Sequence, residues 1–207
     1  AAIHKHPTTN ARPLTDQVLG SVSRAWYDSA TASILVAVRY PGQEAHIESI
    51  EISTGHVKRI LDIPGASGLS VTSLVFDPSS RTLFYTTNNA DWRNLLALDM
   101  ATGHTRMLIR DARIGDLAFN RADNSLWGVR HDNGFSTLVR MPYPYSEWNR
   151  VNTLPYGRDL FNLDVAPDGT SLIGSMSEIS GDQRLVRMNV ANLLRGDTAT
   201  EVLYDFD

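Results

Sequence analysis

The sequence predicts an all-β fold, a β-propeller of four-stranded antiparallel blades, on the basis of three observations. A pattern of strand, tight polar turn and strand occurs four times along the 207 residues. Its aligned anchor residues are spaced 49, 43 and 46 residues apart, which is the length of a four-stranded blade. A second motif repeats 48 residues apart in an independent register. The anchors are Tyr27, Phe76, Phe119 and Val165, and about four blades are expected over residues 20–64, 69–110, 112–155 and 159–205.

The first motif predicts the first two strands of each blade. In the copy at residues 71–85, the two strands flank the turn Asp77-Pro78-Ser79-Ser80. The last copy has Ala166-Pro167-Asp168-Gly169 at the same place. Proline presets the dihedral angles of such a turn, and Asp or Asn closes it with side-chain hydrogen bonds. We therefore expect an antiparallel hairpin at each copy.

The second motif predicts the third and fourth strands. Ile50–His56 matches Leu98–His104 almost residue for residue, and both segments end in a Thr-Gly turn in which glycine can take a positive φ. Fourth strands are expected at residues 57–61 and 105–109. In the last two blades this turn is longer, and it covers residues 142–148 in one and residues 190–196 in the other. The pattern of residues 190–196 predicts a short helical turn closed by glycine.

Two questions of architecture stay open at this stage. A β-sandwich with evenly spaced strands is the alternative fold, but it does not explain a repeat every four strands. Propellers close with four to eight blades, so the chain is expected to be either a four-bladed ring or an incomplete ring from a larger propeller. Residues 1–19 are expected to be a tail or a strand of a neighbouring blade. An open set of blades would expose its outermost sheets, which predicts self-association through blade edges.

Composition excludes several classes of partner. The formal net charge is −4 and the Lys and Arg residues are scattered singly, so nucleic acid is not an expected partner. No apolar run approaches the 18 or so residues of a membrane span. The absence of cysteine excludes disulfides, thiolate nucleophiles and cysteine-ligated metals.

The run Val-Ala-Pro-Asp-Gly-Thr-Ser-Leu-Ile-Gly at residues 165–174 resembles the core of the repeat in the TolB-like, WD-type propeller superfamily of bacterial envelope proteins. Phe76-Asp77-Pro78 followed by Leu83-Phe84-Tyr85 is similar. The resemblance covers residues 20–205 and implies a propeller in a periplasmic or secreted protein. The Trp-Asp pair that ends many WD repeats is absent, so eukaryotic scaffold functions are not implied.

The predicted topology assigns the candidate binding residues to one face. The loop between strands 2 and 3 of a blade shares a face with the connection from the preceding blade, and propellers commonly bind ligands on that face. These segments are rich in Arg, Asp, Asn and aromatic residues, as binding surfaces are. The predicted ligand-binding residues are Asn89, Trp92, Arg93, Arg113, Arg130, His131, Asp132, Asn133 and Arg158.

The densest polar cluster in this set is Arg130-His131-Asp132-Asn133. In a functional interpretation, Arg130 and His131 anchor a carboxylate or a phosphate. In the structural alternative, Asp132 and Asn133-Gly134 simply fold a solvated hairpin. Trp92 is interpreted either as a contact anchor or as a tryptophan that caps the core.

The sequence has no catalytic signature. It contains no Gly-x-Ser-x-Gly elbow, no His-Glu-x-x-His motif and no calcium-loop pattern. No catalytic residue, cofactor or metal is therefore predicted. The expected function is a non-catalytic module that binds a protein or peptide in a bacterial envelope or secreted protein. The alternative is an accessory or gating propeller of a larger hydrolase or peptidase. A weaker hypothesis is carbohydrate binding through Trp92, Trp148, Tyr143 and Tyr145.

Overall fold

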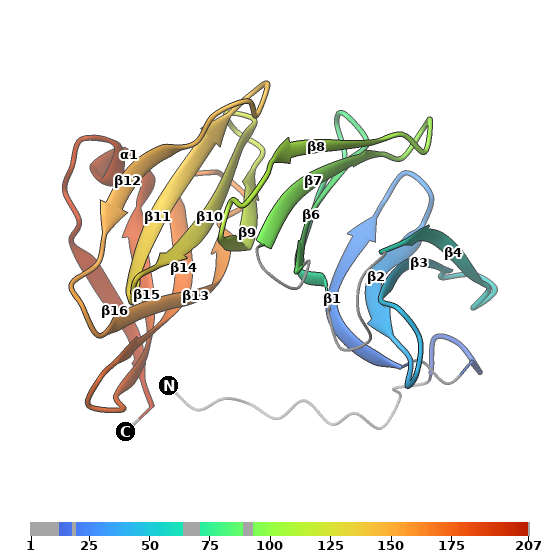
Figure 1. Cartoon of the computed structure of the whole chain (residues 1–207), viewed down its shortest axis with the longest axis horizontal. Helices are drawn as coiled ribbons and strands as arrows, with labels where there is room; N and C mark the ends of the chain where they lie inside the picture. The colour runs from blue at the N-terminus through green and yellow to red at the C-terminus, as the bar shows by residue number, and fades with distance from the viewer. Residues whose placement is uncertain (1–12, 18–19, 64–70, 89–92, 207) are drawn as a thin grey trace.

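The computed structural model describes residues 13–17, 20–63, 71–88 and 93–206 (Figure 1). Within these residues, sixteen strands form four separate sheets of four antiparallel strands. In each sheet the strands pair in sequence order, as in a propeller blade. The predicted all-β propeller is confirmed.

The strand bounds agree with the repeat. Blade 1 contains β1 (Ser21–Asp28), β2 (Ser33–Arg39), β3 (His46–Glu51) and β4 (Val57–Asp62). Blade 2 contains β5 (Val71–Asp77), β6 (Thr82–Asn88), β7 (Arg93–Asp99) and β8 (Thr105–Ile109). Blade 3 contains β9 (Ile114–Asn120), β10 (Ser125–Asp132), β11 (Phe135–Pro142) and β12 (Asn149–Thr153). Blade 4 contains β13 (Arg158–Val165), β14 (Ser171–Glu178), β15 (Gln183–Asn189) and β16 (Thr200–Asp205).

The predicted helical turn is also present. It is α1 (Val190–Leu194), which Asn189 caps at its N-terminus and which is followed by Gly196 at φ 85°. In the described part of the chain, no helix is long and apolar enough to cross a membrane.

The turns between the first two strands close as their composition predicts. In every blade a side-chain oxygen of Asp or Asn accepts the backbone N–H of the residue two positions later. The four pairs and their distances are Asp28–Ala30 (3.1 Å), Asp77–Ser79 (2.9 Å), Asn120–Ala122 (2.9 Å) and Asp168–Thr170 (3.0 Å).

Apolar cores join each blade to the next. Three clusters of buried side chains lie between blades 1 and 2, blades 2 and 3, and blades 3 and 4. The same repeat position, eight residues after each anchor, contributes Leu35, Phe84 and Trp127, which are exposed by 1%, 0% and 0%. Ile173 occupies this position in blade 4 but is only half-buried, since no following blade lies over it in the described part of the chain.

Polar contacts reinforce the blade interfaces. Arg81, in the β5–β6 turn, donates from Nη1 to both carboxylate oxygens of the buried Asp28 of blade 1, at 2.6 and 2.7 Å. The indole Nε1 of Trp26 donates to the carbonyl of Leu74 at 2.7 Å, which ties β1 to β5. Contacts between β1 and β5, β5 and β9, and β9 and β13 show that the first strands of successive blades lie next to one another, and we call the centre of the propeller, where these innermost strands converge, its channel.

Candidate functional site

Each innermost strand has one register irregularity, and a polar residue lies in or next to it. The pairing register of β1, β5, β9 and β13 with the second strand of the blade shifts at this point. We call the four residues three positions before the anchors the channel belt. They are Arg24, Ser73, Asp116 and Asn162. Asp116 and Asn162 have positive φ values of 49° and 53°, the left-handed conformation that bulged residues often adopt.

Side chains of the channel belt satisfy backbone groups of the following blade. Ser73 Oγ accepts the N–H of Leu117 at 2.6 Å, and Asp116 Oδ1 accepts the N–H of Asn162 at 2.8 Å. A bulge removes an N–H from its sheet, and these bonds supply the missing acceptor. Arg24 reaches the same place from blade 1 and donates from Nη2 to Asn162 Oδ1 at 3.2 Å.

A cavity of about 280 Å³ lies between the innermost strands at the level of the belt. The charged and amide groups that line it are Arg24, Asp116, Asn162 and Asp164. Its apolar lining comes from Ala25, Trp26, Leu74, Leu117 and Leu163. The centre of the propeller therefore combines one cation, two carboxylates and an aromatic ring.

His131 connects this cavity with the channel rim, which is the end of the propeller where β9 begins and β10 ends. Its Nε2 lies 3.7 Å from Asp116 Oδ2, and its Nδ1 lies 3.7 Å from Asp159 Oδ1 of blade 4. The imidazole is thus placed between carboxylates of two blades. Burial alone would raise the pKa of Asp116, but the nearby imidazole of His131, the hydrogen bond from the N–H of Asn162 and the charges of His131 and Arg24 lower it below its ordinary value.

Ser136 gives this cluster a superficial likeness to a Ser-His-Asp triad. Its Oγ lies 3.2 Å from His131 Nδ1, but it also donates a short hydrogen bond to Asp159. The residue is fully buried. A hydroxyl that is buried and bound to a carboxylate cannot approach a substrate carbonyl, so the cluster is a hydrogen-bond network and not a nucleophilic site.

The structure brings together most of the predicted residues at the rim. Asp132 accepts a hydrogen bond from Arg113 at 2.7 Å and pairs with Arg130 at 2.9 Å. The guanidinium of Arg130 lies 5.2 Å from the centre of the Trp148 ring, a cation–π distance. Asp132 therefore links Arg113 and Arg130 into one ion-paired group, whereas the side chain of His131 points to the other face of β10, toward Asp116 and Asp159.

Arg93 belongs to the same rim. The N–H of Arg113 donates to the carbonyl of Arg93 at 3.1 Å, and the N–H of His131 donates to the carbonyl of Arg113 at 3.0 Å. The Arg93 guanidinium also lies against Gly115, where a Cβ atom would approach Nη1 to 2.3 Å. The absence of a side chain at Gly115 therefore allows Arg93 to cover the start of β9.

The secondary structure of the Arg130–Asn133 cluster differs from the prediction. Arg130, His131 and Asp132 were expected in a loop, but they belong to β10, which pairs with β11 as far as Asp132 opposite Phe135. Asn133 and Gly134, both with positive φ, form a two-residue turn of the type that continues strand pairing to its end. Asn133 therefore lies in the turn that closes this hairpin.

Arg158 lies at the start of β13 and donates to Glu178 of its own blade at 2.8 Å. Asn89 and Trp92 lie outside the described residues. The carbohydrate hypothesis needs exposed rings, but Tyr145 is buried against Phe84, with ring centroids 4.7 Å apart. Tyr145 is a core residue, so these aromatic residues do not form one binding strip.

Four central residues were not singled out from the sequence: Arg24, Asp116, Asp159 and Asn162. A signal for three of them was present, because the position three before each anchor is polar in all four repeats, whereas its strand neighbours are largely apolar. Among the described residues, no group of three or more His, Asp and Glu side chains could hold a metal ion.

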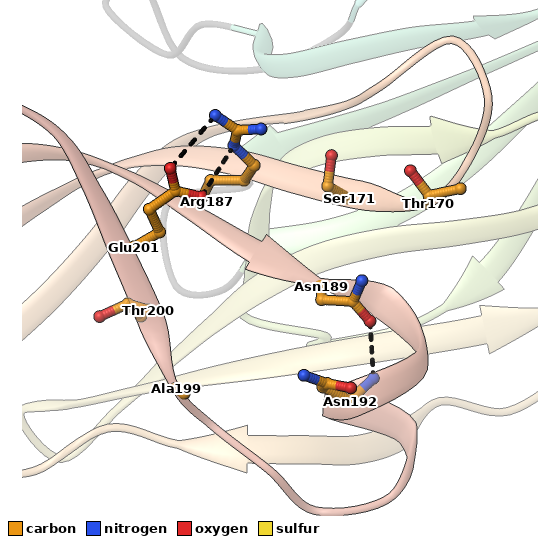
Figure 2. Close-up of a pocket in the computed structure, with 8 residues that line it drawn as sticks. All are labelled: Thr170, Ser171, Arg187, Asn189, Asn192, Ala199, Thr200 and Glu201. Atoms are coloured by element: carbon orange, nitrogen blue, oxygen red, sulfur yellow. Dashed lines mark hydrogen bonds and ion pairs between the residues drawn. The ribbon is translucent and has the colours of Figure 1, made fainter.

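A second hollow, of about 400 Å³, lies on blade 4 beside α1. Figure 2 shows Arg187 facing Glu201 and Asn189 facing Asn192 along its lining. Arg187 and Glu201 form an ion pair at 3.4 Å, and Asn189 Oδ1 accepts the N–H of Asn192 at 2.9 Å as the helix cap. Because structural contacts account for these groups, we place the candidate site at the rim and the channel belt.

Comparison with solved structures supports the fold. TolB from Acinetobacter baumannii aligns with a TM-score of 0.72 and 12% identity over 90% of this chain and 44% of its own. A putative TolB from Agrobacterium tumefaciens gives 0.69 and 12%, over 90% of this chain and 68% of its own. A puromycin hydrolase gives 0.68 and 15%, over 95% of this chain and 31% of its own.

The chain therefore has the fold of TolB-like β-propellers and spans less than half of the first of these structures. No protein-family model matches the sequence, and no curated protein matches it either.

Proposed function

We propose that this chain is a non-catalytic propeller module that binds a protein or peptide partner at the channel rim. One observation supports this most directly: Arg113, Arg130 and Asp132 form a connected charged group at the rim, and the adjacent His131 contacts Asp116, which lines the cavity at the channel belt. Such a group offers directional hydrogen bonds to a partner, and the cavity at the channel belt is large enough for a partner side chain.

Rigid elements hold this surface in place. Arg130 and Asp132 belong to a fully paired strand, and Asp132 binds Arg113 from the neighbouring connection. A preorganised surface loses little conformational entropy on binding, which favours affinity. The resemblance to bacterial envelope propellers further supports a periplasmic or secreted location as part of this proposal.

An accessory propeller of a larger hydrolase is the second candidate. It is favoured by the similarity of 95% of this chain to 31% of a puromycin hydrolase. In that case the rim would face a catalytic domain. The two candidates differ in the partner: a separate protein in the first, and a hydrolase domain in the second.

The proposal is tested with the tagged chain as bait in a quantitative capture experiment. We expect the double variant Arg130→Ala/His131→Ala to recover at least about tenfold less partner than the wild type, because charged anchors at the centre of an interface contribute 2 kcal/mol or more. The matched control, Arg187→Ala/His104→Ala, removes the same two residue types at exposed positions away from the rim and should recover partner normally.

Both double variants are first compared with the wild type by circular dichroism and thermal unfolding. If folded Arg130→Ala/His131→Ala protein recovers as much partner as the wild type, the rim is not the binding surface. A captured hydrolase domain in place of a separate protein would support the second candidate.

A further inference from the structure

We infer that the channel belt binds a carboxylate group of an extended peptide that enters the channel, with Arg24 as its cationic anchor. The inference rests on the proposed function, since it names the chemistry of the partner group that the cavity binds. It concerns residues that differ from those that define the rim.

Arg24 is the only positively charged residue among the described residues that line the cavity. Its side chain is 36% exposed. The described hydrogen bonds of its guanidinium go to neutral oxygens: the Ser23 carbonyl at 3.0 Å and Asn162 Oδ1 at 3.2 Å. A guanidinium has five donors in a fork that matches a carboxylate, so Arg24 keeps the capacity to bind one.

The nearby carboxylate of Asp116 does not occupy the hydrogen-bond donors of the Arg24 guanidinium. Its Oδ1 lies 3.6 Å from Arg24 Nη2, beyond normal hydrogen-bond distance, and accepts the N–H of Asn162 instead. Its Oδ2 faces His131 at 3.7 Å. The charge of Asp116 is therefore stabilised largely from the rim side and by the backbone, and Arg24 stays oriented toward the cavity.

The remaining lining suits an acidic side chain on a peptide. With its Oδ1 bound to Arg24, Asn162 has an amide nitrogen that can donate to a second ligand oxygen. Trp26 presents an apolar wall, and its bond to the carbonyl of Leu74 fixes the ring. Asp164 also lines the cavity, but its Oδ1 accepts the N–H of Val165 at 2.8 Å. The lining thus provides a cation, a neutral donor and a surface for methylene groups, next to the carboxylates of Asp116 and Asp164.

The dimensions favour a short segment. A volume of about 280 Å³ is just below the 300–1,000 Å³ of typical small-molecule pockets, so the cavity accepts a side chain and its immediate neighbours. The carboxylate can come from a Glu or Asp side chain or from a C-terminus, and both sources present the same two oxygens to Arg24.

Peptide titrations followed by NMR on the isotope-labelled full chain test this inference. The probes are Ac-Gly-Gly-Glu-Gly-Gly-NH₂ and its Gln counterpart for a side-chain carboxylate, and Ac-Gly₅-OH and Ac-Gly₅-NH₂ for a terminal one. We expect the acidic member of one pair to shift the side-chain signals of Arg24, Asn162 and Trp26, and to bind at least about tenfold more tightly than its neutral counterpart. The pair that shows this difference identifies the source.

Variants separate recognition from a structural role. Arg24→Gln should weaken binding of the acidic peptide about tenfold or more, and Arg24→Lys should retain part of the affinity because it keeps the charge. Arg187→Gln, on the exposed part of blade 4, should bind as the wild type does. Equal affinities for the acidic and neutral peptides, or for wild type and a folded Arg24→Gln variant, would overturn the inference.

The same variants distinguish this inference from the proposed function. Loss of partner capture in Arg130→Ala/His131→Ala, combined with no preference for acidic peptides, would leave the rim as a binding surface and exclude the belt. A preference for acidic peptides without any effect of the rim variant on capture would exclude only the rim.

Discussion

Replacing Trp127 with alanine is expected to lower the free energy of unfolding by about 3–5 kcal/mol, the range for removing a large aromatic side chain from a core. Trp127 is fully buried in the cluster between blades 3 and 4. Its Nε1 donates to Ser125 Oγ at 2.9 Å, and Ser125 in turn donates to Asp123 at 2.5 Å. The substitution would thus create a cavity and interrupt this chain of hydrogen bonds.

Urea unfolding followed by circular dichroism measures this effect. Trp127→Phe keeps most of the apolar contacts and should be less destabilising than Trp127→Ala. The control Ile179→Ala changes a side chain that is 84% exposed and should stay within about 0.5 kcal/mol of the wild type. A loss below about 1 kcal/mol in Trp127→Ala would contradict the role assigned to the interface between blades 3 and 4.

Asp28→Ala is expected to destabilise the chain by about 3 kcal/mol, near the lower end of the range for breaking a buried ion pair. The carboxylate is 1% exposed and binds Arg81, Thr31 and the N–H of Ala30. Arg81 is 28% exposed and can recover some hydration, which limits the loss. Asp62→Ala, which removes the exposed partner of Arg59, should cost no more than about 1 kcal/mol in the same urea measurement.

The contribution of the Asp28 carboxylate to the free energy of unfolding should also depend on pH. Burial raises the pKa of Asp28, but the hydrogen bonds from Arg81, Thr31 and Ala30 and the Arg81 charge outweigh it, so the pKa lies below its ordinary value. A lowered pKa in the folded state contributes stability above the unfolded-state pKa of about 3.9, and this contribution is lost as the pH falls through the folded-state pKa. The stability difference between wild type and Asp28→Asn should therefore narrow below about pH 4. A difference that stays constant from pH 7 to pH 2 would contradict this.

Much of the blade structure could be predicted because its signals are local. The Asp and Asn turn residues and the Thr-Gly turns specify hairpins within a few residues, and the structure shows those hairpins. The end of β10 was predicted less well, since Arg130, His131 and Asp132 have a loop-like composition. The two-residue turn at Asn133-Gly134 keeps these residues paired with β11.

The channel belt could not be assembled from the sequence, because its contacts join residues from different blades. Arg24 and Asn162 are 138 positions apart and meet only when the innermost strands converge. The position three residues before each anchor is polar in every repeat, which indicates that these residues share an environment. It does not indicate which of them contact one another. The burial of Tyr145 could not be predicted for a different reason. Its segment has no counterpart in the other repeats, so the repeat gave no indication that its ring packs beside Phe84.

The unequal covering of the outermost blades has a consequence for local unfolding. On the side of blade 1 that faces away from blade 2, Val36 and Ile50 are each only 3% exposed, whereas Ile173 of blade 4 is half-buried. The energy needed to open a segment depends on the apolar contacts that it loses, so the amide hydrogens of β14 and β15 should exchange with solvent faster than those of β6 and β10. Exchange recorded at increasing protein concentration would also report on self-association, because a second copy packed over Ile173 would slow exchange in blade 4 first.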